Sequence, residues 1–164
     1  MSDVRATTVR CGPGQARALE LGAGPAVVVL ASPPAGAGAY LPLLEALRAR
    51  FRSIALELTC PDPERAEARD AQLVAVAVEA MASLGVERAV VVGQGTNGRV
   101  AVELAVGRPG LVAGLVLAAP ASLARLQDVH VPVLLYRRGR LIEHPALFAR
   151  ALATFARRLQ VETA

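Results

Sequence analysis

The chain has 164 residues, of which 54% are hydrophobic and 3% aromatic, and its formal net charge is +4. It contains arginine but no lysine, which excludes a mechanism through a lysine Schiff base. The arginines are not interleaved with aromatic side chains on which bases could stack, which argues against nucleic acid as a partner. A chain of this length is expected to form one domain, which we place at residues 1–164.

The number of cysteines and the length of the apolar runs indicate the cellular compartment of the protein. Cys11 and Cys60 are too few for a disulfide framework, and no cysteine or histidine spacing matches a zinc site, so we expect no metal. Pro, Gly or Arg interrupts every apolar run before the ~20 residues that a membrane-spanning helix needs. Residues 1–12 lack the apolar core of a signal peptide. We therefore expect a cytoplasmic protein without a membrane span.

Short apolar runs alternate with stretches of helical periodicity, a pattern typical of a parallel sheet covered by helices. The runs at 7–10 and 16–21 flank the turn at 12–14 and predict an antiparallel hairpin at the sheet edge. Residues 26–31 (AVVVLA) are continuously apolar, as a strand buried on both faces requires. The pattern then predicts a helix at 41–50, a strand at 53–59, a charged turn at 61–69, a helix at 70–84, a strand at 89–92, a helix at 99–106, strands at 111–117 and 131–136, and a helix at 147–159.

The order and spacing of these segments resemble the α/β-hydrolase family over residues 7–120 and 127–159. The resemblance rests on PAVVVLASPPAGAGAYLPLLEALRARFRSIALEL, LGVERAVVVG, GRPGLVAGLVLAAP, and VPVLLY followed by EHPALFARALATF. It implies an α/β fold with a mostly parallel sheet and helices on both faces. It also implies a reduced form of this fold. The segment from Pro120 to Val131 is too short for a cap domain, and the family's eighth strand has no counterpart.

The family places its nucleophile on a sharp strand-to-helix turn with the pattern Gly-x-Ser-x-Gly-Gly. The six matching positions are 93–98, GQGTNG, so Gly95 takes the nucleophile's place and offers no side chain. Thr96 stands one position later and would point elsewhere from such a turn. The resemblance therefore implies a retained turn with a vacant nucleophile position.

Three other parts of the hydrolase machinery depart from the family pattern. The oxyanion-hole segment is Ala31-Ser32-Pro33-Pro34, in which the donor position, Pro33, has no N–H to give. Arginine occupies positions 137, 138 and 140, where the family places its acid, and His144 lies several residues too late for the catalytic histidine. Loss of a triad member costs on the order of a million-fold in turnover. We therefore expect that this chain is not a Ser-His-Asp hydrolase.

Residues 93–98 also match G-x-G-x-x-G, the phosphate-binding turn of dinucleotide folds. Such a site needs an acidic residue for the ribose at the end of the next strand, about 20 positions on. That strand ends in Leu-Ala-Ala-Pro, and no acidic residue follows it until Asp128. The motif also comes after several strands instead of the first. We expect no nicotinamide, flavin or other cofactor.

An open α/β sheet has its cleft at the carboxyl ends of its strands. The candidate pocket residues are those that end or follow strands, together with a tyrosine at the start of the first helix. They are Ser32, Tyr40, Cys60, Gln94, Thr96, Asn97 and Arg137. Gln94 and Asn97 could orient a polar ligand group, and the N-terminus of the following helix favours an anion or a carbonyl oxygen.

These candidates also have structural interpretations. Thr96 could cap the helix, and Asn97 could suit the turn geometry. Cys60 could be a small buried hydrophobe, and Glu57 is expected to anchor loop hydrogen bonds. Arg137, Arg138 and Arg140 could be a charged strand end or a clamp for a carboxylate or phosphate group.

Three functions remain open. The favoured one is a non-hydrolytic protein that binds a small, largely apolar molecule, with a cyclase, isomerase or lyase of biosynthesis among the options. It predicts that Gln94→Ala or Asn97→Ala removes ligand binding with little loss of thermal stability. The first alternative is a catalytically inactive assembly or partner subunit, a homodimer or hetero-complex formed across an exposed sheet edge, and we expect a dimer. The second alternative is a residual esterase or thioesterase that uses water in the Gly95 space, with Glu57 or His144 as acid or base.

Overall fold

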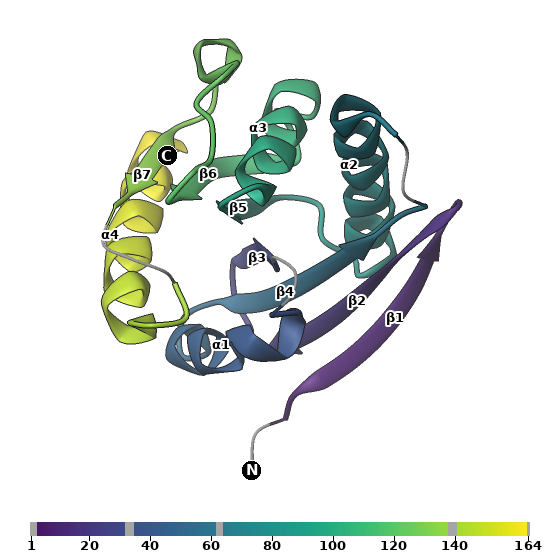
Figure 1. Cartoon of the computed structure of the whole chain (residues 1–164). Helices are drawn as coiled ribbons and strands as arrows, with labels where there is room; N and C mark the ends of the chain where they lie inside the picture. Colours follow the sequence, from purple (N-terminus) through teal and green to yellow (C-terminus); the bar gives the residue numbers. More distant parts are fainter. Residues whose placement is uncertain (1–2, 32–34, 62–63, 138–140, 164) are drawn as a thin grey trace.

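The computed structural model describes residues 3–31, 35–61, 64–137 and 141–163, and these contain one seven-stranded sheet in the order β1-β2-β4-β3-β5-β6-β7 (Figure 1). At one edge, the first two strands form a hairpin, and β2 pairs antiparallel with β4. All other neighbours pair in parallel. The strands are β1 (Arg5–Cys11), β2 (Gly14–Leu21), β3 (Ala26–Leu30), β4 (Arg52–Thr59), β5 (Ala89–Gln94), β6 (Val112–Ala118) and β7 (Val133–Tyr136).

Helices cover both faces of this sheet, as the sequence predicted (Figure 1). The first and last α-helices pack side by side on one face, and the second and third lie on the other. Two short 3-10 turns lie at η1 (Ala37–Tyr40) and η2 (Leu126–Asp128). The α-helices are α1 (Leu41–Leu47), α2 (Ala66–Ser83), α3 (Asn97–Gly107) and α4 (Pro145–Thr163).

The apolar side chains of the central strands alternate between two buried clusters. On β3, Val28 packs toward α2 and α3, whereas Val27 and Val29 pack toward α1 and α4. On β5, Val91 and Val92 divide in the same way. Because both faces of these strands are covered, the continuous apolar runs in the sequence are explained. Burial of each such side chain contributes roughly 1.5–3 kcal/mol.

Most element boundaries differ by a few residues from the predicted ones, and three of these differences have a clear local cause. The charged segment 66–69 is the first turn of α2 and not a loop, because Ala, Glu and Arg are good helix formers and Glu67 favours the helix N-terminus. The first helix ends at Leu47, whose carbonyl accepts the N–H groups of Arg50 (3.1 Å) and Phe51 (3.0 Å). β7 begins only at Val133, after a proline that has no N–H for the ladder.

The described residues contain neither a cap domain nor an eighth strand. Residues 119–132, between β6 and β7, contain one 3-10 turn and no cap domain. Among the described residues between β7 and α4 there is no strand, so β7 is an edge of the sheet. Among all the described helices, none is both long and apolar enough to cross a membrane. The parallel strands all end at one edge, which is where the candidate site lies.

Candidate functional site at the glycine turn

The turn between β5 and α3 has Gly95 at its apex. Gly95 has φ +58, a left-handed conformation that costs a residue with a side chain roughly 1–2 kcal/mol. Its N–H donates to the carbonyl oxygen of Ala118 at 3.1 Å, and its own carbonyl accepts the N–H groups of Gly98 (3.1 Å) and Ala121 (3.3 Å). Three hydrogen bonds therefore fix the backbone at Gly95, the residue that the family resemblance matches to a nucleophile.

The three glycines of this turn serve different purposes. A Cβ at Gly93 would lie 2.8 Å from the Cβ of Ala101, so close packing of α3 on β5 requires glycine there. A Cβ at Gly98 would meet its nearest atom, on Pro120, at 3.6 Å, which is an ordinary contact. A Cβ at Gly95 would meet no atom within 4 Å, and the residue is only half-buried. Open space therefore lies beside Gly95.

Asn97, the first residue of α3, holds the helix to the end of β3. Its side-chain amide donates to the carbonyl oxygens of Leu30 (3.3 Å) and Ala31 (3.0 Å), and the residue is only 9% exposed. Asn97 thus has a structural role that the sequence did not reveal. The capping interpretation of Thr96 is wrong, since its exposed side chain makes no capping hydrogen bond.

Two predicted pocket residues are brought together at the carboxyl ends of the strands. The hydroxyl of Tyr40 donates to Oε1 of Gln94 at 3.4 Å, and Tyr40 is only 2% exposed. Tyr40 ends η1, whereas Gln94 ends β5, immediately before Gly95. The contact therefore joins the first covering helix to the glycine turn.

Glu57 anchors a loop on the same side of the sheet. Its Oε2 accepts the backbone N–H of Ala37 at 3.1 Å, which holds the start of η1 against β4. The predicted structural role of Glu57 is confirmed by this bond. The adjacent Gly36 adopts φ +70, and a Cβ there would lie 3.0 Å from the Glu57 carboxylate.

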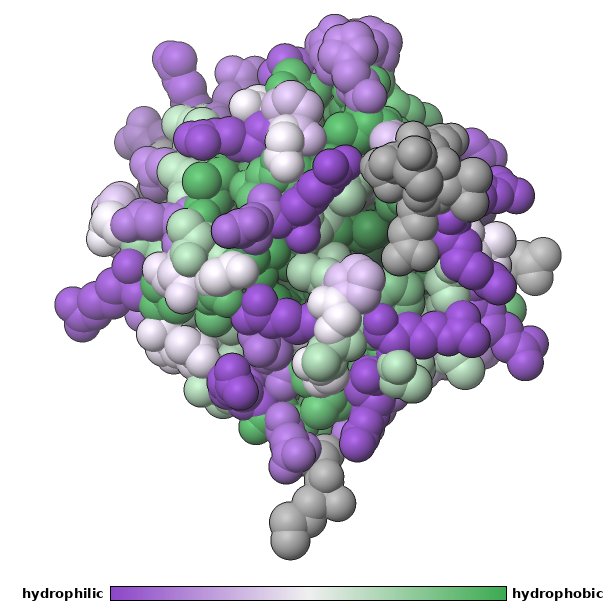
Figure 2. Space-filling view, turned by 180° about the vertical axis from the view of Figure 1, so that it is seen from behind, coloured by the Kyte–Doolittle hydropathy of each residue, from purple (hydrophilic) through white to green (hydrophobic). Residues whose placement is uncertain are grey.

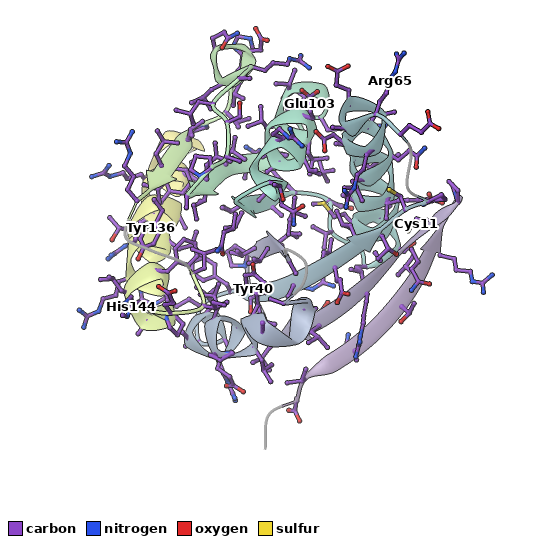
Figure 3. The ribbon with its side chains drawn as sticks, viewed as in Figure 1. Cys11, Tyr40, Arg65, Glu103, Tyr136 and His144 are labelled. Carbon is purple, nitrogen blue, oxygen red and sulfur yellow. The ribbon has the colours of Figure 1, made fainter. Side chains whose placement is uncertain are left out.

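Sequence analysis missed Tyr136, the last residue of β7. Its ring packs edge-to-face on Phe148 of α4, with centroids 5.0 Å apart, and the residue is 6% exposed (Figure 3). Its hydroxyl is buried and has no hydrogen-bond partner among the residues that the structure describes. Tyr136 belongs to the same buried cluster as Tyr40 and Ala118. The sequence did offer a signal for Tyr136, because a tyrosine ends an apolar strand. Side chains along a strand point alternately to its two faces, and this alternation directs Tyr136 toward α1 and α4.

Cys60 does not lie beside the turn. The last residue of β3, Leu30, pairs with Leu56 of β4, so β4 extends beyond the end of β3. Cys60 follows Leu56 by four residues and therefore lies well beyond the end of β3. It lines a separate recess of about 280 Å³ with Thr59 and the β1–β2 hairpin. Its packing against the cluster under α2 supports the structural interpretation.

The remaining predicted residues are at the surface or outside the described residues. Arg137 is exposed after β7 and lines a cavity of about 490 Å³ with Leu147 and Arg150 of α4. His144 is exposed, and its carbonyl accepts the N–H of Phe148 at 3.2 Å. The described residues hold no group of three metal-ligating side chains. Ser32, Pro33, Arg138 and Arg140 lie outside the described residues.

Comparison with known proteins identifies the fold. No protein-family model matches the chain, and no curated protein matches it. Among solved structures, a Rhodococcus hydrolase of 2-hydroxy-6-oxo-6-phenylhexa-2,4-dienoate has TM-score 0.65 at 23% identity over 73% of this chain and 47% of its own. An epoxide hydrolase from Vigna radiata has TM-score 0.61 at 22% identity, and the match covers 71% of this chain and 40% of the epoxide hydrolase. A haloalkane dehalogenase from Bradyrhizobium elkani has TM-score 0.62 at 21% identity, and the match covers 72% of this chain and 42% of the dehalogenase.

This chain therefore has the α/β-hydrolase fold, with a mostly parallel sheet and no cap in its described part. The matched region spans less than half the length of each of these three proteins. Identities of this size establish a common fold and do not transfer an activity. The chemistry must be argued from the residues around Gly95.

Proposed function

We propose that this chain is a non-hydrolytic form of the α/β-hydrolase fold that binds a small, largely apolar molecule beside Gly95. The supporting observation is the turn itself. Its backbone keeps the left-handed conformation and the hydrogen bonds of a fixed apex, while the apex residue leaves open space where a nucleophile would stand. A hydrolase that lost its nucleophile would lose on the order of a million-fold in turnover.

The surroundings support a ligand of mixed character. Ala31, Ala118 and Phe148 are buried apolar members of the cluster that contains Tyr40 and Tyr136. The Tyr40–Gln94 pair and the Tyr136 hydroxyl are polar groups in these apolar surroundings. Ligand sites of this kind are mostly apolar with a few placed polar groups. The proposal includes a cyclase, isomerase or lyase that works on such a molecule by shape and hydrogen bonding.

The test fills the space beside Gly95. Gly95→Leu is compared with Gly85→Leu, since Gly85 also has a left-handed φ, +71, and open space around a Cβ. Both variants introduce similar backbone strain, but only the first occupies the proposed site. Binding of the dye 1-anilinonaphthalene-8-sulfonate should weaken in Gly95→Leu and persist in Gly85→Leu. Equal binding by both variants would contradict the proposal.

A second candidate function, an assembly subunit that forms a homodimer, rests on the free edge of β7. Leu115 donates its N–H to the carbonyl of Pro132 (2.9 Å), and Ala119 donates to that of Tyr136 (3.3 Å). Even-numbered residues of β7 thus face β6, and by alternation Val133 and Leu135 direct their backbone groups to the edge. Such an edge is a template for pairing with another chain.

The matched variants for this alternative are Leu135→Pro and Leu135→Ala. Both shorten the side chain, but only proline removes the outward N–H. If two copies pair through β7, sedimentation should show a dimer for Leu135→Ala and a monomer for Leu135→Pro. A monomeric unmodified protein would contradict this alternative. The residual-hydrolase alternative gains no support, since Glu57 already holds Ala37 and His144 is exposed.

A further inference from the structure

A groove runs along the outer side of the α1–α4 helix pair, away from the glycine turn. It has a volume of about 590 Å³ and is lined on one side by the end of α1 and the turn that follows, including Ala46, Ala49 and Arg50. Its other side is α4. The two helices lie side by side on the same face of the sheet (Figure 1).

The face that α4 presents to this groove is regular. The lining residues have the spacing of one helical stripe, separate from the buried stripe formed by Phe148, Leu152, Phe155 and Leu159. Small and basic residues make up the groove stripe: Ala146, Ala149, Arg150, Ala153, Thr154 and Arg157. One side of α4 therefore serves the core, and an adjacent side is shaped as a shallow channel of alanines.

The charge of the groove is of one sign. Arg50, Arg150 and Arg157 line it and are exposed, and its described lining residues include no acidic side chain. The ion pairs among described residues involve other arginines, such as Arg52 with Glu20 and Arg125 with Glu103. Within the described part of the chain, Arg157 donates only to the hydroxyl of Thr154, at 3.5 Å. The three groove arginines are thus available to carboxylates of a partner.

We infer that this groove docks an acidic helix of a protein partner. Alanines on both walls let a third helix approach closely, at the 8–10 Å axial separation of packed helices. Arg150 and Arg157 are seven residues apart, two helical turns or about 10.5 Å. A partner helix with carboxylates at i and i+7 beside a small apolar face matches this spacing.

Other polyanions fit the groove less well. Single-stranded nucleic acid would need aromatic side chains for base stacking, and Phe51 is the only aromatic one among the described lining residues. A membrane surface would need bulky apolar side chains to insert beside the arginines, whereas the α4 stripe offers alanine and threonine. Figure 2, seen from behind the view of Figure 1, shows apolar patches interspersed with hydrophilic side chains on that side of the molecule.

The test uses the whole chain and a labelled synthetic helix of about four turns, built from Ala and Leu with Glu at the i and i+7 positions. A control peptide has Lys in place of Glu. The double variant Arg150→Glu/Arg157→Glu reverses charge in the groove. Arg69→Glu/Arg108→Glu makes the same change in net charge on exposed residues of α2 and the end of α3, on the other face of the sheet.

We expect the Glu peptide to bind in fluorescence anisotropy, and the Lys peptide not to bind. The groove variant should lose at least about tenfold in affinity, whereas the control variant should bind like the unmodified chain. Added salt should weaken binding, because exposed charges are screened. No binding of the Glu peptide, or equal losses in both double variants, would overturn the inference. Tighter binding to phosphatidylglycerol vesicles or to a single-stranded oligonucleotide would also overturn it.

Discussion

The side-chain amide of Asn97 lies 3.0 Å from the carbonyl oxygen of Ala31 and donates a hydrogen bond to it. Asn97 begins α3, and Ala31 immediately follows β3, so this bond connects the glycine turn to the neighbouring strand. Because of this bond, we expect a substitution of Asn97 to change the stability of the fold. Sequence analysis expected Asn97→Ala to remove ligand binding with little cost in stability, whereas the structure makes Asn97 part of the scaffold.

Asn97→Ala should therefore lower the free energy of unfolding by about 1–3 kcal/mol, because two backbone carbonyls lose their buried donor. Thr96→Ala is the matched control, since its side chain is exposed and makes no capping bond, and it should change stability by less than about 0.5 kcal/mol. Urea denaturation measures both values. Equal stability of the two variants would show that the Asn97 bonds contribute nothing.

The glycines at 93 and 98 should respond in opposite ways to alanine. Gly93→Ala places a methyl group 2.8 Å from Asn97 O and should cost about 1–3 kcal/mol through overpacking of α3 on β5. Gly98→Ala adds a methyl group at ordinary contact distance inside a helix and should stabilise the fold by up to about 1 kcal/mol. Thermal unfolding of the two variants separates these effects. A stability loss at Gly98 as large as that at Gly93 would disprove the packing argument.

Restoring the hydroxyl should not restore hydrolysis. Gly95→Ser fits the open space and should cost roughly 1–2 kcal/mol because of its left-handed backbone. The chain's two histidines, His130 and His144, are both exposed, so we expect no general base beside the new serine. Assay of p-nitrophenyl acetate should give no turnover above background for either protein. Sustained turnover by Gly95→Ser would mean that the rest of the machinery is present.

The thiol of Cys11, the last residue of β1, allows its burial to be tested through the pH dependence of its reactivity and of the protein's stability. Burial, and to a lesser degree the charge of Glu79, raises the pKa of the Cys11 thiol above its ordinary value of about 9.0. The folded state therefore favours the neutral thiol. Its stabilising contribution is complete below the unfolded pKa and is lost as the pH rises through the higher folded pKa.

In a Cys60→Ser background, iodoacetamide should modify Cys11 in the folded protein with a pH midpoint above that found in urea. Cys11→Ser should flatten the loss of stability at alkaline pH. A folded midpoint at or below the unfolded one would contradict the burial argument, since the reactive species is the thiolate.

The sequence was a good guide to the fold because both of its signals are local. Continuous apolar runs such as 26–31 and helical spacing such as 147–159 follow from which faces are buried. The glycines at 93–98 located the strand-to-helix turn to within two residues of the start of α3. The prediction failed at the charged segment 66–69, where Ala, Glu and Arg favour a helix and α2 begins at Ala66.

The site was harder to predict because its contacts join distant residues. The bonds from Tyr40 to Gln94 and from Asn97 to Ala31 span more than fifty positions and depend on how α1 and β3 lie against β5. Cys60 was misplaced because the length by which β4 extends beyond β3 cannot be seen in its own pattern. Tyr136 was overlooked because an unpartnered hydroxyl is a property of packing.

The most direct test of the proposed function is native mass spectrometry of the purified protein beside its Gly95→Leu and Gly85→Leu variants. The account predicts that the unmodified chain and Gly85→Leu retain the same additional small-molecule mass, and that Gly95→Leu does not. Retained mass that persists in Gly95→Leu, or no retained mass in any of the three, would contradict a ligand site beside Gly95.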